Sequence, residues 1–159
     1  MPPPGVAVTV EADARAPVEQ AFHAIAPVAL ERIFERLGPL PGVTGTREQT
    51  GAWDHVGATR VVELSDGSEA RERIAAYAAP SHFAYRVGGF TGPLRRLVAH
   101  ADGAWWFEDD GAGGTHVRWT YTFQPLALRA WLVRLAVARL WRPYARRALA
   151  RSVAIAERG

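Results

Sequence analysis

Two acidic residues, Glu63 and Glu72, lie on either side of a turn signal and are the first candidates for chemistry in this sequence. Asp66-Gly67 is typical of a two-residue hairpin turn, and it predicts that strands at 57–65 and 68–77 pair with each other. In that pairing Glu63 and Glu72 are diagonal neighbours on one face. Such a carboxyl pair holds a proton readily, because desolvation and like-charge repulsion both disfavour a second charge. The pair is therefore a candidate general acid or base.

Charge distinguishes the two faces of this expected hairpin. The two-residue turn places Val61 opposite Glu72, with Ile74 on the same face. That face carries less charge, so we expect it to point inward and Val61 and Ile74 to contact a ligand. Two alternatives to catalysis are that the carboxylates only make the pocket polar, or that both are solvated near its open end with Glu72 free or held by an arginine. The opposite face carries Arg60, Glu69, Arg71 and Arg73.

Aromatic residues alternate along the strands that follow. In strand 98–108 we expect Trp105 and Phe107 to face inward, because the alternate positions include ionisable side chains that are costly to bury unpaired. Large aromatics with a polar tip often line small-molecule sites, whereas core packing is the simpler alternative. Tyr85 is also the third acid-base candidate. The candidate ligand contacts on these strands are Phe83, Tyr85, Trp105, Phe107, Trp119 and Tyr121.

The remaining chain supplies the elements that position these residues. Alternating valines predict a first strand at 6–12, Pro17 begins a short helix, and a second short helix is expected after Pro27. Strands then continue to Pro125. A long helix is expected from Leu126 to about Glu157.

This C-terminal helix is expected to cover the sheet. Its apolar side includes Trp131 and Leu135, which are therefore further candidate ligand contacts, and Pro143 should kink it or split it. A curved sheet cannot bury its concave face alone. The sequence thus predicts an α+β fold in which about six or seven antiparallel strands wrap around the helix. We expect one domain over residues 1–159, with a flexible start at residues 1–5.

The chain resembles the START/Bet v 1-like (SRPBCC) superfamily, in particular its bacterial polyketide cyclase/dehydrase-like branch. The resemblance rests on segment 16–22 (APVEQAF), on Asp66-Gly67 followed by Glu72 and Ile74, and on segment 114–119 (GTHVRW) before a long helix. It implies a helix-grip fold with a hydrophobic cavity. Members of the superfamily include ligand carriers, aromatase/cyclases, hormone receptors and chaperone activators, so the resemblance leaves the activity open.

Composition removes several classes of function. The sequence has no cysteine, and its five histidines lack ligand spacing, so we expect no metal and no cofactor. It contains no nucleotide-binding glycine loop and no nucleophile elbow. The N-terminus lacks the pattern of a secretory signal, and no apolar run approaches the roughly 20 residues of a membrane span. We therefore expect a cytoplasmic protein.

Basic charge is concentrated in the C-terminal segment 126–159, where eight arginines accompany one acidic residue, Glu157. A solvated helix face is the simplest interpretation, and binding to a membrane surface is the alternative. We expect no nucleic-acid partner, and the sequence leaves the oligomeric state open. The preferred function is binding of a small hydrophobic or aromatic ligand, polyketide-like or lipid-like. Cyclase or dehydratase chemistry at Glu72, Glu63 or Tyr85 is a second hypothesis.

Overall fold

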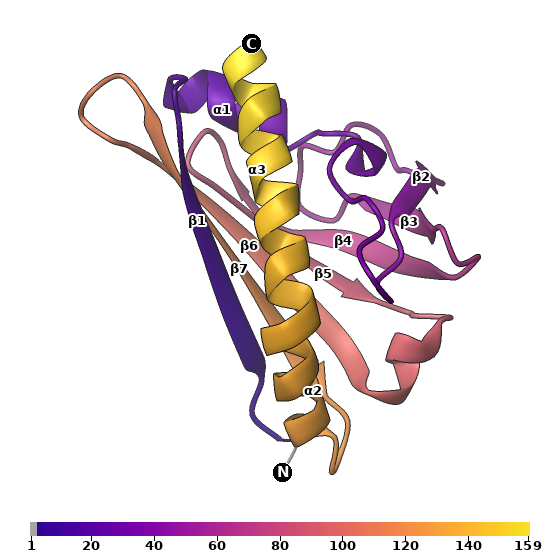
Figure 1. The fold of residues 1–159 in the computed structure, drawn as a ribbon. Helices are drawn as coiled ribbons and strands as arrows, with labels where there is room; N and C mark the ends of the chain where they lie inside the picture. Colours follow the sequence, from indigo (N-terminus) through magenta and orange to yellow (C-terminus); the bar gives the residue numbers. More distant parts are fainter. Residues whose placement is uncertain (1–2) are drawn as a thin grey trace.

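A single antiparallel sheet of seven strands, in the order β1-β7-β6-β5-β4-β3-β2, is the frame of the protein (Figure 1). The computed structural model describes residues 3–159; the expected flexible start therefore lies partly outside the described residues. The strands are β1 (Val6–Ala14), β2 (Val43–Arg47), β3 (Thr59–Leu64), β4 (Glu69–Ala78), β5 (His82–Gly88), β6 (Val98–Asp109) and β7 (Thr115–Pro125). The expected α+β helix-grip architecture is confirmed.

Helix α1 (Val18–Ile25) follows β1, but the second short helix expected after Pro27 is reduced to a 3₁₀ turn, η1 (Leu30–Arg32). The Phe34 carbonyl explains this difference. It accepts a hydrogen bond of 2.9 Å from the backbone N–H of Val43, the first residue of β2. Strand β2 thus occupies a carbonyl that a continuing helix would need for its own hydrogen bonds.

The C-terminal helix runs in front of the sheet in Figure 1 and consists of α2 (Ala130–Ala136), the π-helical segment η3 (Val137–Trp141) and α3 (Arg142–Arg158). In the wide turn of η3 the Arg142 N–H bonds to the Val137 carbonyl, five residues earlier. Pro143, at the start of α3, has no N–H to donate, and the wide turn lets the helix continue through it without a break.

The helix begins four residues later than expected. The Leu126 N–H donates a hydrogen bond of 2.8 Å to the Leu97 carbonyl, so the chain first turns against the loop before β6. Leu128 has a positive φ of 64°, which is incompatible with a right-handed helix. The expected boundary at Leu126 is therefore wrong.

Small residues on α3 allow it to pack closely against the rest of the protein. Ala145, Ala148, Ser152 and Ala156 are all buried. Gln20 of α1 donates a hydrogen bond of 2.8 Å to the Ala156 carbonyl, which fixes α1 beside the C-terminal end of α3. Helix α1 and the buried alanines of α3 therefore belong to one hydrophobic core.

The β3–β4 hairpin turns through three residues, Ser65, Asp66 and Gly67, and the expected two-residue turn is wrong. Asp66 Oδ1 accepts a hydrogen bond of 2.8 Å from the Ser68 N–H, and Gly67 has a positive φ of 87°, as the last position of such a loop requires. The register therefore shifts by one residue, and a shift of one residue exchanges the faces of one strand relative to the other.

The corrected register pairs Arg60 with Glu72 and Val62 with Ala70. Arg60, which the expected register placed outside, therefore shares the inward face with Glu72. Val61 and Glu63, which it placed inside, lie on the opposite face of β3, because side chains alternate along a strand.

Candidate functional site

A cavity of about 490 Å³ lies between the sheet and the N-terminal half of the C-terminal helix. Its walls come from strands β3 to β7, from helix residues 133–144, and from the segment 25–43 that closes one side. Pro39 and Pro41 belong to that segment. Tyr144 Oη donates a hydrogen bond of 2.7 Å to the Pro41 carbonyl, which ties the segment to α3. The volume lies in the range of small-molecule sites.

Aromatic side chains dominate the inner wall. Tyr85, Gly103 and Tyr121 are cross-strand neighbours on β5, β6 and β7. A Cβ atom at Gly103 would lie 2.6 Å from Tyr85 Oη, so the absence of a side chain there makes room for the tyrosine ring. In the adjacent row Phe83 and Trp105 stack with ring centroids 5.9 Å apart.

Tyr85 places a polar group within this aromatic wall. Its hydroxyl accepts a hydrogen bond of 3.4 Å from Trp105 Nε1. Burial, and secondly the nearby Glu72 carboxylate, raises the pKa of the Tyr85 phenol well above its usual value. Tyr85 is therefore a neutral phenol at physiological pH, and its hydroxyl is a hydrogen-bond donor toward the cavity.

A buried ion pair forms the second polar group of the cavity. Arg60 Nε donates a hydrogen bond of 2.8 Å to Glu72 Oε1, and the two residues are only 7% and 8% exposed. The Arg60 guanidinium also lies over the ring of Trp53, 3.9 Å from its centroid. The two terminal nitrogens of Arg60 form no hydrogen bond with other described residues, so they can donate to an oxygen atom in the cavity.

Trp141 lines the cavity from the helix side, opposite the sheet. Its indole packs against Tyr121, with ring centroids 4.6 Å apart. Across residues 3–159, the Nε1 atoms of Trp119 and Trp141 are the buried side-chain polar atoms left without a hydrogen-bond partner. An unpaired buried donor is costly. Trp141 therefore contributes its ring to the cavity wall, while its Nε1 atom is enclosed by protein.

The predicted site residues divide into four groups, and Glu63 alone forms the last. Those that line the cavity are Glu72, Phe83, Tyr85, Trp105 and Tyr121. Those that are buried without lining it are Val61, Ile74, Phe107 and Trp119. Ile74 instead packs in a separate small cluster with Trp53 and Ala58.

Trp131 and Leu135 form the third group. They are 62% and 45% exposed and do not line the cavity, so their expected inward orientation is wrong. Val133 and Val137 are buried instead. At 100° per residue, these two valines lie on roughly the opposite side of the helix from Trp131 and Leu135. The sequence pattern showed two apolar stripes and did not indicate which one faces the sheet.

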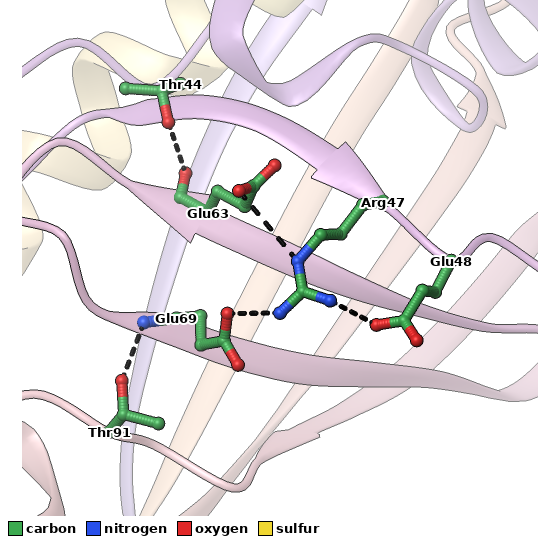
Figure 2. A network of polar contacts seen from close by, with 6 residues as sticks. All are labelled: Thr44, Arg47, Glu48, Glu63, Glu69 and Thr91. Atoms are coloured by element: carbon green, nitrogen blue, oxygen red, sulfur yellow. Dashed lines mark hydrogen bonds and ion pairs between the residues drawn. The ribbon is translucent and has the colours of Figure 1, made fainter.

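Glu63 does not line the cavity and belongs to the polar network shown in Figure 2. Its carboxylate lies 3.9 Å from Arg47 Nε, and its side chain is 46% exposed. Arg47 also pairs with Glu48 and with Glu69, the latter at 2.5 Å. The predicted Glu63–Glu72 acid-base pair is therefore not formed.

Arg60 is the main site residue that the sequence prediction missed. The sequence of the turn could have indicated it, because Ser65-Asp66-Gly67-Ser68 also fits a three-residue loop with glycine last.

Among residues 3–159 no group of three or more metal-ligating side chains occurs. No helix in that range is long and apolar enough to cross a membrane.

Comparison of the sequence with known protein families gives a match over nearly the whole chain. A family model described as "Polyketide cyclase / dehydrase and lipid transport" matches residues 5–157. The chain belongs to this family. The resemblance to the START/Bet v 1-like superfamily is thereby confirmed, whereas a comparison with curated proteins gives no match.

Solved structures share the fold of this family member at low sequence identity. The Zhui aromatase/cyclase from Streptomyces sp. R1128 is 18% identical with a TM-score of 0.73, and 98% of this chain and 95% of that chain are covered. The allergen Ara h 8.0201 is 17% identical with a TM-score of 0.69, covering 98% and 100%. The protein XoxI from Bacillus cereus is 13% identical with a TM-score of 0.67, covering 94% of each chain.

Proposed function

We propose that the protein binds a small, largely aromatic or lipid-like molecule in the cavity between the sheet and the C-terminal helix. The single observation that carries this proposal is a largely apolar cavity of about 490 Å³ whose wall contains a buried ion pair. A buried ion pair rarely repays its desolvation by adding stability alone, so its presence in a cavity wall favours a role in recognition.

The polar groups define the ligand further. Arg60 and Tyr85 line the cavity, and each carries an N–H or O–H donor that has no acceptor among the described residues. The ligand should therefore carry at least one oxygen acceptor, such as a carbonyl, on an otherwise apolar body. Polyketide-like and oxygenated lipid-like molecules both meet this description.

Cyclase or dehydratase chemistry is the second candidate, favoured by Glu72 and Tyr85 lying at the same cavity. Tyr85, as a neutral phenol, could donate a hydrogen bond to a substrate carbonyl, while Glu72 could accept a proton from the adjacent carbon. The Arg60 hydrogen bond to Glu72 already engages one oxygen of this carboxylate. That engagement favours binding over proton transfer and makes enzyme activity the second choice.

Native mass spectrometry of freshly purified protein tests the proposal. We expect an adduct of one small molecule that is lost on denaturation and is absent from a variant in which Ala101→Trp fills the cavity. Ala101 is buried, and its side chain lines the cavity. Thermal unfolding checks that the variant is folded. A folded wild-type protein without any adduct, and without affinity for aromatic carbonyl compounds, would contradict the proposal.

A further inference from the structure

Large exposed apolar side chains gather on one part of the molecule. Within residues 3–159, six large hydrophobic residues are exposed, and five of them lie just before β6, in the turn before α2, or on the N-terminal half of the C-terminal helix. Val56 is the exception. The five are Leu94, Leu128, Trp131, Leu135 and Leu140, and together with the arginines described next we call them the docking face.

Three of the five are near neighbours in the sequence. Trp131 and Leu135 are four residues apart on one side of α2, and Leu128 lies in the turn just before that helix. They are 86%, 62% and 45% exposed. Such a stripe is costly in water unless another apolar phase covers it.

Arginines flank this stripe. Arg129, Arg134 and Arg139 are exposed, and none of them forms an ion pair with any acidic residue among residues 3–159. Segment 126–156 itself contains no acidic residue. The docking face therefore combines projecting apolar side chains with uncompensated positive charge.

The same face reaches the cavity. Leu94 and Leu140 line the cavity and are also 37% and 36% exposed, so they lie at its rim. The hydrogen bond from Leu126 N–H to the Leu97 carbonyl holds the loop before β6 against the start of the helix. The apolar stripe and the cavity rim are thus parts of one surface.

We propose that the docking face binds the surface of an anionic lipid bilayer, with its leucines and Trp131 inserted at the interface and its arginines against the headgroups. Amphipathic helices with this combination lie in the plane of a bilayer, and an exposed tryptophan suits the interfacial zone. Each arginine near an anionic surface adds to the attraction. This inference concerns the surface alone and does not depend on which ligand occupies the cavity.

Two other occupants fit the observations less well. A symmetric contact with a second copy would bring the same arginines together from both chains, without acids on the segment to neutralise them. Nucleic acid would satisfy the arginines but would leave four exposed leucines without a partner. An anionic bilayer satisfies both the charge and the apolar surface.

Vesicle co-sedimentation of the full chain tests the proposal. Vesicles of equal parts phosphatidylcholine and phosphatidylglycerol should bind the protein at low salt, and binding should fall as salt rises because the charges are exposed. Pure phosphatidylcholine vesicles should bind it much more weakly. The Arg134→Gln/Arg139→Gln variant should bind anionic vesicles about 30-fold more weakly. The Trp131→Ala/Leu135→Ala variant should lose at least about tenfold.

Matched controls lie elsewhere on the surface. Val56→Ala removes an exposed apolar side chain, and Arg71→Gln/Arg73→Gln removes two exposed arginines of β4. Both controls should bind vesicles like the wild type. None of the four substituted docking-face residues lines the cavity, so their variants should keep the affinity for a cavity ligand. Loss of vesicle binding with retained ligand binding therefore tests the surface separately from the proposed function.

Three results would overturn the proposal. The first is wild-type protein that does not bind the anionic vesicles at low salt, and the second is control variants that lose as much binding as the docking-face variants. The third is a dimer in sedimentation velocity that Trp131→Ala/Leu135→Ala dissociates, together with no vesicle binding. That third result would assign the face to a second copy of the chain.

Discussion

The guanidinium of Arg60 and the carboxylate of Glu72 meet inside the sheet, with Arg60 Nε 2.8 Å from Glu72 Oε1. Both side chains are more than nine-tenths buried and both line the cavity. They are directly opposite each other on neighbouring strands, so the hairpin register alone brings them together. The pair places buried charged groups in the wall of a largely apolar cavity.

Breaking this pair on one side should strongly destabilise the protein. Arg60→Gln leaves the Glu72 carboxylate buried without its partner, and we expect a loss of about 3–5 kcal/mol in the free energy of unfolding. Arg60→Gln combined with Glu72→Gln removes both charges and should recover most of that loss. Urea unfolding measures both variants. Arg73→Gln, at the exposed position next to Glu72 on β4, is the control and should change stability by less than about 0.5 kcal/mol. A double variant as unstable as the single one would contradict this account.

Gly103 should be intolerant of a side chain because of Tyr85. In Gly103→Ala the new Cβ overlaps the tyrosine ring, and we expect about 1–3 kcal/mol of destabilisation with weaker ligand binding. Replacing Tyr85 with leucine in the same chain should restore part of the stability, since the shorter side chain removes the overlap. Gly45→Ala in β2 is the matched control, because nothing lies within 4 Å of its Cβ position. Equal effects at Gly45 and Gly103 would show that loss of glycine in a strand, and not the tyrosine, is the cause.

His116 should make stability depend on pH. Hydrogen bonds from its ring to Asp13, first, and to Glu11 raise the pKa of His116 above 6.5 in the folded state. The stabilisation by charged His116 is therefore fully present at pH below the pKa of the unfolded state. It is lost as pH rises through the pKa of the folded state. The wild type should therefore lose stability, relative to His116→Gln, as pH rises from about 6 to about 9. Denaturant unfolding across this range measures the difference, and parallel curves for the two proteins would contradict the prediction.

The sequence predicted the architecture well because hydrophobic periodicity specifies it. The alternation of Phe83 and Tyr85 indicated the inward face of β5, and both are buried as expected. Ionisable neighbours likewise identified Trp105 and Phe107 as inward-facing on β6, and both are buried. Periodicity of this kind depends only on which side of an element meets the core.

The polar part of the site was harder to predict, since it depends on a difference of one residue in a turn. Two-residue and three-residue loops both fit the sequence around Asp66-Gly67. The two-residue loop would place Val61 beside Glu72 on the inward face, whereas the observed three-residue loop places Arg60 there. Periodicity also could not choose between the two apolar stripes of the helix, so Trp131 and Leu135 were placed inside. These choices depend on tertiary contacts, such as those of Val133 and Val137 with the sheet.

Titration with two naphthalenes of matched size tests the central claim most directly. 2-Acetylnaphthalene carries a carbonyl oxygen and 2-ethylnaphthalene does not, and both should quench the tryptophan fluorescence of the cavity wall. We predict that the acetyl compound binds about three- to tenfold more tightly, as one hydrogen bond from Arg60 or Tyr85 would provide. That preference should shrink in the Arg60→Gln/Glu72→Gln variant. No saturable binding of either compound to the folded protein would contradict the account.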